Sequence, residues 1–168
     1  KTLDKTGEWF LNKSTKKLRM YFSGNNPNSH LVKASTLDTL VYCADKNYLT
    51  FANINFEGGN IFGFYLHSGS KIKILNCEIN YIGRTAVYYP GNTFLTVDGC
   101  IISNTNDHVM FGSSTSTNAY VGHNTIKNTG IIPGNAGTGD GHNFGISIQA
   151  NNCIAEYNTI VNSGYFAI

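Results

Sequence analysis

The chain has 168 residues, which is enough for one domain with a hydrophobic core but short for two. Charged residues make up 13% of it, the net charge is +2, and seven of the twelve Lys and Arg residues lie at or before Lys33. Because no basic stripe follows, the sequence argues against a nucleic-acid partner. No apolar run reaches the roughly 18 residues that a membrane-spanning helix needs. Asn (22) and Gly (18) are abundant and tolerate left-handed backbone, so we expect many short strands separated by turns.

The first 35 residues differ from the rest of the chain. Two apolar segments, GEWFLN and LRMYFSG, flank the polar stretch Lys13–Lys17, a pattern that predicts a β-hairpin. An open end of stacked strands would be prone to aggregation unless something covered it. We therefore expect residues 1–35 to form a cap whose aromatic side chains cover the end of the region that follows. These side chains are Trp9, Phe10, Tyr21 and Phe22.

The remaining chain repeats. Five segments align on one apolar position, with successive intervals of 23, 23, 24 and 34 residues. The last interval is one normal repeat plus about ten residues that the Gly-rich stretch Gly130–Gly141 supplies. A fixed interval of this length predicts stacked coils, so we expect an all-β fold, a right-handed, single-stranded parallel β-helix of about five coils over residues 36–168. The aligned positions are Phe56, Ile79, Ile102, Ile126 and Ile160.

A second position in each repeat forms a column of like residues. In stacked coils, equivalent side chains lie about 4.8 Å apart, directly above one another. We expect buried Cys77 and Cys100 to be stacked as free thiols, and buried Asn side chains to bond to the turn backbone above and below. No His or Cys spacing typical of a metal site is present, so no metal is predicted. The column reads Ile54, Cys77, Cys100, Asn124 and Asn158.

Each repeat also contains a second strand, read from FGFYL, TAVYY, HVMFG and FGISI. Alternation of apolar residues predicts which side chains point inward and which point outward. The chain stops at Ile168, partway through a new coil, which predicts that it is a piece of a longer protein. The inward pairs are expected to be Phe64/Leu66, Val87/Tyr89, Val109/Phe111 and Ile146/Ile148, and the outward residues Tyr65, Tyr88, Met110 and Ser147.

These columns resemble the right-handed β-helix repeats of the pectin-lyase-like superfamily over Thr39–Ile168. The opening GEWFLNKSTKKLRMYF, followed by STLDTLVYCADKNYLTFANINFEG, is similar to the start of large secreted bacterial β-helix proteins that act on polysaccharides. The resemblance implies a secreted or cell-surface protein and a polysaccharide partner, which would lie in a long groove along one strand face. It does not specify an oligomeric state. The scaffold hosts hydrolases, lyases, epimerases and binding proteins, so chemistry must be argued from side chains.

The leading hypothesis is glycoside hydrolysis by paired carboxylates assisted by histidine. His108 is interpreted as standing in a column of small residues, where a titratable side chain suggests a role. The other members of this column are Gly63, Ala86, Gly145 and Ala167. The Gly-rich loop is expected to bring two further titratable groups one coil above Asp107 and His108. The predicted catalytic residues are Asp107, His108, Asp140 and His142.

Two alternatives remain open. Arg84, the only Arg of the repeat region, could neutralise a uronate carboxylate in a lyase or epimerase. Such a lyase could also use Ca²⁺, and no cofactor is expected otherwise. The other alternative is a noncatalytic carbohydrate-binding or surface-adhesion solenoid that works through Tyr65 and Tyr88. The predicted substrate-binding residues are Tyr65, His67, Arg84, Tyr88, Asn143, Ser147 and Gln149.

Overall fold

A computed structural model describes residues 3–24, 26–132 and 141–168. The chain divides into two compact units, Lys1–Ala34 and Ser35–Ile168. Within the described residues, no helix has the length and apolar character needed to cross a membrane. The two units are considered separately below.

The first unit contains the predicted hairpin. Strands β1 (Trp9–Asn12) and β2 (Lys17–Met20) pair antiparallel, with Trp9 opposite Met20. The polar turn between them is held by Asn12, whose side-chain oxygen accepts a hydrogen bond from the Thr15 amide at 2.9 Å. A short 3₁₀ helix, η1 (Pro27–Ser29), follows. The hairpin is confirmed, and its role as a cap stays a prediction.

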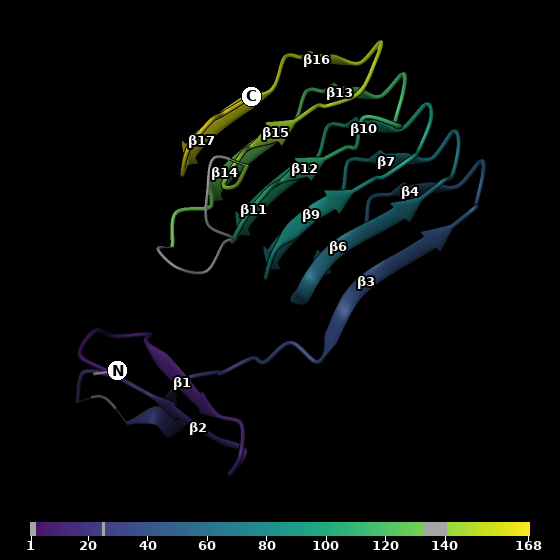
Figure 1. Cartoon of the computed structure of the whole chain (residues 1–168). Coiled ribbons are helices and arrows are strands. Elements are labelled where there is room, and N and C mark those ends of the chain that lie inside the picture. The colour runs from purple at the N-terminus through teal and green to yellow at the C-terminus, as the bar shows by residue number, and fades with distance from the viewer. Residues whose placement is uncertain (1–2, 25, 133–140) are drawn as a thin grey trace. The chain divides into compact units, whose positions relative to one another are not determined.

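The second unit is a solenoid of three parallel sheets with five strands each (Figure 1). We name each sheet by its first strand. The β3 sheet consists of β3 (Leu37–Ala44), β6 (Gly59–His67), β9 (Thr85–Tyr88), β12 (Met110–Phe111) and β15 (Ile146–Ser147). The β4 sheet consists of β4 (Thr50–Ala52), β7 (Lys73–Leu75), β10 (Thr96–Asp98), β13 (Tyr120–Gly122) and β16 (Ile154–Glu156). The β5 sheet consists of β5 (Asn55–Glu57), β8 (Glu78–Ile82), β11 (Ile101–Thr105), β14 (Thr125–Thr129) and β17 (Thr159–Ser163).

The corners between sheets are built from residues with left-handed backbone, stacked coil upon coil. At one corner Asn104, Asn128 and Asn162 have φ of 55°, 57° and 58°. Asn and Gly adopt this conformation at low cost, which accounts for their abundance. Their side-chain amides also bond along the stack, since Asn128 donates to Asn104 and Asn162 donates to Asn128, each at 3.1 Å.

The core follows the predicted columns. Ile79 pairs with Ile102, Ile102 with Ile126, and Ile126 with Ile160, as the repeat intervals require. Cys77 and Cys100 are buried free thiols, which confirms that expectation.

Asn124 satisfies its buried amide as predicted. Its oxygen accepts a hydrogen bond from the Cys100 amide at 2.8 Å, and its nitrogen donates to the Val97 carbonyl at 3.0 Å. Asn158 repeats part of this pattern one coil higher, donating to the Val121 carbonyl at 2.8 Å. Along this column, cysteine is therefore replaced by asparagine in the later coils, and the asparagine side chains hydrogen-bond to the backbone of the coil below.

The prediction for strand β12 was wrong by one residue. Met110 pairs with Val87 and is fully buried, whereas Phe111 pairs with Tyr88 on the outer face. The next inward place belongs to Gly112, where a Cβ atom would lie 2.5 Å from the Tyr89 ring. Tyr89 fills that space from the coil below, so a side chain at position 112 is excluded.

Candidate functional site

The outer face of the β3 sheet carries a chain of aromatic rings. Tyr65 and Tyr88 stack at 5.2 Å between centroids, and Phe111 continues the column at 5.7 Å from Tyr88. The column then turns toward the beginning of the strands through His108, whose ring lies 4.9 Å from that of Phe111. We call this set the aromatic belt. Its members, in contact order, are Tyr42, Tyr65, Tyr88, Phe111, His108, Phe144 and Phe166.

Rings within the belt cover one another, so the belt presents edges and phenolic hydroxyls rather than a row of open faces. Tyr65 and Tyr88 are inclined by only 27°. Tyr42 differs, because its ring stands at 78° to that of Tyr65 and it is 65% exposed. The middle of the belt is thus partly buried, whereas the rings at its two ends, Tyr42 and Phe166, are exposed.

Asp107 lies beside the belt and is fully buried, with 0% of its side chain exposed. A buried carboxylate needs hydrogen bonds and opposite charge to offset its lost hydration. Asn143 donates its backbone N–H to Oδ1 at 2.9 Å, and Nδ1 of His142 lies 3.0 Å from Oδ2. Arg84 supplies positive charge, with Nε 3.6 Å from Oδ2. In the described parts of the chain, the groups around Asp107 therefore include no second carboxylate.

His108 is packed between rings and is 4% exposed. It stacks on Phe111 and on Phe144, at 4.9 and 5.4 Å between centroids. Burial lowers the pKa of His108. The Asp107 carboxylate opposes this effect, and electrostatic interactions with His142 and Arg84 add to it. Its Nε2 is 3.4 Å from Asp107, while its Nδ1 is buried without a hydrogen-bond partner.

The column assigned to His108 from the sequence was wrong. The neighbouring pairing of Phe62 with Thr85 and of Val87 with Met110 places His108 in register with Thr85, and Phe144 lies above it. Val109 occupies the column of Gly63 and Ala86. The ring of His108 is therefore not unusually large for its column, because the same column contains the aromatic residues Phe62 and Phe144.

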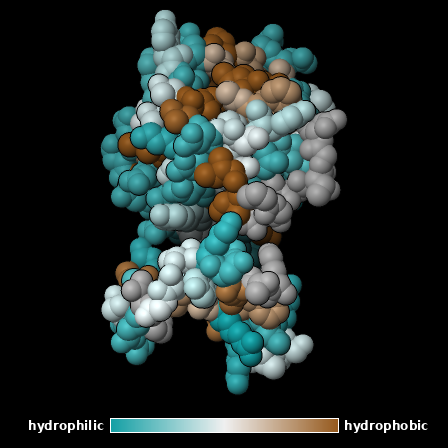
Figure 2. Space-filling view, turned by 90° about the vertical axis from the view of Figure 1, so that its left-hand side faces the viewer, coloured by the Kyte–Doolittle hydropathy of each residue, from teal (hydrophilic) through white to brown (hydrophobic). Residues whose placement is uncertain are grey.

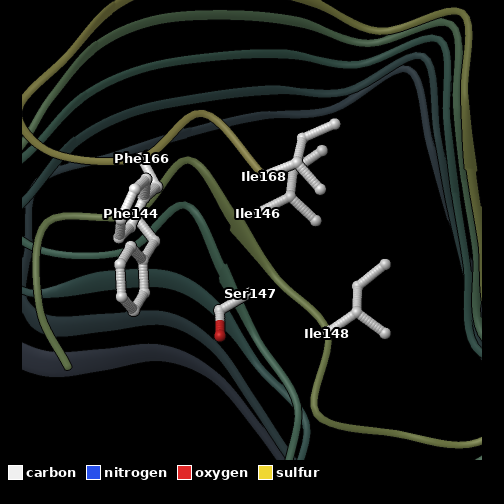
Figure 3. Close-up of a pocket in the computed structure, with 6 residues that line it drawn as sticks. All are labelled: Phe144, Ile146, Ser147, Ile148, Phe166 and Ile168. Atoms are coloured by element: carbon white, nitrogen blue, oxygen red, sulfur yellow. The ribbon is translucent and has the colours of Figure 1, made fainter.

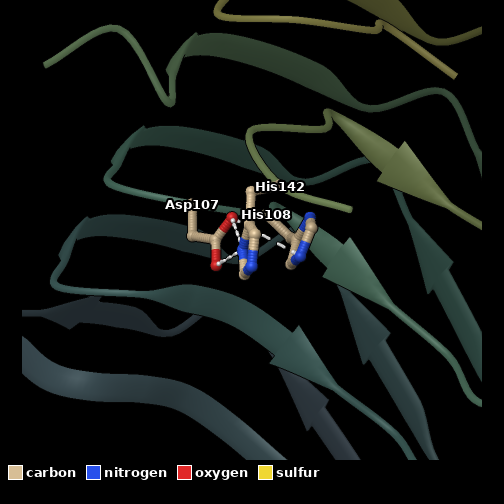
Figure 4. Close-up of side chains that lie close together, drawn as sticks. All are labelled: Asp107, His108 and His142. Carbon is tan, nitrogen blue, oxygen red and sulfur yellow. Dashed lines mark hydrogen bonds and ion pairs between the residues drawn. The ribbon is translucent and has the colours of Figure 1, made fainter. Parts of the chain in front are cut away.

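His142 reaches the site from the start of the segment that returns from the Gly-rich loop. Its side chain is 24% exposed, and its ring lies 5.8 Å from that of His108 (Figure 4). The backbone of the adjacent Asn143 is held by the Asp107 carboxylate. The predicted convergence of Asp107, His108 and His142 is thus observed, whereas Asp140 lies outside the described residues.

The predicted binding residues are distributed around the belt. Tyr65 and Tyr88 are members of it, and Arg84 precedes β9 with 56% of its side chain exposed. Asn143 contributes its backbone N–H rather than its side chain. The others lie farther along the strands: His67 ends β6 with its ring 6.4 Å from that of Tyr65, Ser147 pairs with Phe111, and Gln149 is exposed beyond β15.

A cavity of about 280 Å³ lies at the last coil and not at the Asp107 cluster. The rings of Phe144 and Phe166 lie one above the other on one side, and Ile148 lies apart from them (Figure 3). Its lining is apolar except for Ser147. Elsewhere, on the face of the solenoid drawn in Figure 2, hydrophobic residues form separate patches among hydrophilic ones.

Sequence reasoning missed several aromatic residues in the belt or next to it. Phe62, Phe111 and Phe144 were read as strand residues without a role, although they extend the predicted Tyr65 and Tyr88 pair. The sequence did contain a signal for them, because two of the second-strand segments, FGFYL and FGISI, begin with an aromatic residue at the same aligned position. Their separation in sequence hid the continuity that stacking creates.

Comparison with family models identifies the class. A model described as a right-handed β-helix region matches residues 38–168, so the chain belongs to the right-handed β-helix family. Comparison with curated proteins found no match, and comparison with solved structures found none either. Fold and family together define a right-handed β-helix repeat protein of a carbohydrate-active or surface type.

Proposed function

We propose that this chain binds an extended uronic-acid polysaccharide along the aromatic belt and processes it at the Asp107 cluster. The observation that carries the proposal is the continuity of the belt with a buried Asp–His pair and an exposed Arg. An extended chain can contact rings on successive coils, which a compact ligand cannot. The belt and the cluster would then be parts of one site.

The chemistry of the belt suits a carbohydrate. Sugar rings combine apolar C–H patches with hydroxyl groups, and Tyr offers an apolar body with a polar tip. Tyr42, Tyr65 and Tyr88 place three such side chains on neighbouring strands. Arg84, at the edge of the cluster, is suited to pair with a carboxylate in a bidentate manner. Acidic sugars are therefore favoured over neutral ones.

The cluster suits proton abstraction better than direct attack by a carboxylate. Asp107 is fully buried, so it acts as a positioning residue that accepts a hydrogen bond from Nδ1–H of His142. The bare Nε2 of His142 would take the C5 proton of a uronate whose carboxylate pairs with Arg84. The C–H electron pair then forms the C4–C5 double bond, and the glycosidic oxygen leaves from C4 with a proton from solvent. Reprotonation of C5 from the other face would instead give an epimer.

Hydrolysis by paired carboxylates stays a prediction. It requires a second carboxylate at roughly 5 to 9.5 Å from the first. Asp140 was the expected partner, and it lies outside the described residues. No observation therefore favours hydrolysis over elimination.

The test is product analysis on alginate and on polygalacturonate. We expect wild-type protein to produce unsaturated ends that absorb in the ultraviolet, and His142→Ala to lower the rate at least about a hundredfold, in line with the loss of a general base. His123→Asn is the matched control, because His123 also pairs with a carboxylate, Asp98 at 2.9 Å, but lies directly after strand β13, away from the β3 sheet. New reducing ends without ultraviolet absorption would instead establish hydrolysis, and full activity of His142→Ala would remove its proposed role.

A further inference from the structure

We infer that Asp107, His108 and His142 form a binding site for one divalent transition-metal ion of the Zn²⁺ type. Each side chain offers one donor atom, and the three donor atoms lie within 4.8 Å of one another. The inference of a site rests on this geometry, whereas its role in catalysis rests on the proposed function.

The distances around Asp107 match the spacing of metal ligands. Bonds of about 2.0 to 2.1 Å at a tetrahedral ion place neighbouring donor atoms roughly 3.3 Å apart. The Asp107 oxygens lie 3.4 Å from Nε2 of His108 and 3.0 Å from Nδ1 of His142. The first distance is long for a hydrogen bond but suits two ligands of one ion.

The remaining geometry requires one ring to turn. The planes of His108 and His142 are inclined by only 17°, and an ion must lie near the plane of each imidazole that binds it. His108 is wedged between Phe111 and Phe144 and has little freedom. His142 is 24% exposed at the end of a loop, so its ring is the one with room to rotate toward the shared point.

The surroundings explain why the cluster is suited to a cation. Nε2 of His108, which lies 3.4 Å from Oδ1 of Asp107, is the ring nitrogen that faces the proposed ion. Two imidazoles and one carboxylate select a borderline transition metal over Ca²⁺ or Mg²⁺, which prefer oxygen ligands.

Three protein ligands leave at least one coordination position open. Water or a substrate carboxylate can occupy it, as at catalytic zinc sites. With an ion bound at Nδ1, neutral His142 would carry its proton on Nε2, so metal-bound water rather than Nε2 would be the base that faces the glycan. Together with Arg84 it would give the cluster a net positive charge, which agrees with an acidic substrate.

The experiment is metal titration of the whole chain after chelator treatment, without glycan. Calorimetry with ZnCl₂ and the visible absorption of added Co²⁺ report binding directly. We expect one saturable site in the wild type, at least a tenfold weaker affinity in His142→Ala and in His108→Phe, and no comparable site for CaCl₂. His108→Phe keeps an aromatic ring in a column that already contains Phe62 and Phe144.

His123→Asn again serves as the control, because His123 and Asp98 form an exposed pair that should not contribute. Absence of saturable Zn²⁺ binding by the wild type would overturn the inference, as would unchanged affinity in His142→Ala or a loss in His123→Asn. Should His108→Phe fail to fold by circular dichroism, the more exposed His142 still decides the result. Metal binding without glycan processing would contradict the proposed function but would still support the metal site.

Discussion

At Asn124 a single buried side chain completes the hydrogen bonds of three coils. Its amide contacts the Cys100 amide, the Val97 carbonyl and the Asn158 side chain at 2.8, 3.0 and 2.9 Å. Removal of one partner leaves the others buried and unsatisfied, which costs more than the net value of the bonds. This position therefore contributes more to stability than its polarity suggests.

We predict that Asn124→Ala lowers the free energy of unfolding by about 2 to 3 kcal/mol. Chemical denaturation followed by circular dichroism measures it. The control is Asn162→Gly, which removes an exposed ladder amide while keeping a residue that accepts the φ of 58°. Its effect should stay within about 0.5 to 1 kcal/mol. Equal stability of Asn124→Ala and the wild type would contradict the amide column.

At the scale of elements, strand β12 depends on a fit between two coils. Tyr89 is fully buried and occupies the place above which Gly112 lies. An added Cβ would meet its ring and hydroxyl oxygen at 2.5 to 2.7 Å, and a packed ring cannot move aside.

We predict that Gly112→Ala destabilises the protein by about 1 to 3 kcal/mol. Tyr89→Leu should recover part of this loss in the double variant, since Leu66 holds the equivalent place one coil below. Thermal melts of the wild type, the two single variants and the double variant give the double-mutant cycle. Gly141→Ala is the control, because no atom of the described residues lies within 4 Å of the added Cβ. Simple additivity of the two changes would show that the ring and position 112 do not compete.

The same strand shows where sequence reasoning stops. The fixed intervals were enough to predict the paired columns of the β5 sheet, because Ile79, Ile102 and Ile126 repeat without ambiguity. In HVMFG every residue but the last could face the core. Alternation alone therefore could not decide whether Met110 or Phe111 points inward. The structure also places Val109 and Met110 inward in succession at a bend, which a strict period of two excludes.

The candidate site was predictable in part for a related reason. Stacking brought Asp107, His108 and His142 together, as the repeat and the loop between coils indicated. The burial of Asp107 was not predictable, because Asn106-Asp107 reads as a polar turn and its shielding depends on the backbone of Asn143 from the next coil. Likewise, alternation predicted that Tyr65 and Tyr88 point outward, but it could not predict that one ring stacks on the other.

At the scale of the whole molecule, the solenoid converts sequence repetition into a line of rings. Each coil contributes one or two side chains to the belt, and the rings of successive coils lie 5.2 to 5.7 Å apart along Tyr65, Tyr88 and Phe111. A surface built this way gains contact area with every added unit of an extended ligand. Affinity should therefore depend on ligand length.

The most direct measurement is calorimetric binding of uronic-acid oligosaccharides of increasing length. The account predicts that affinity rises with length and falls at least tenfold in the Tyr65→Ala/Tyr88→Ala double variant, provided that its fold is intact. Tyr81→Asn, a change at an exposed tyrosine of the β5 sheet whose corner column already holds Asn104, should bind like the wild type. An affinity that does not depend on oligosaccharide length, or that falls as much in Tyr81→Asn as in the double variant, would contradict binding along the aromatic belt.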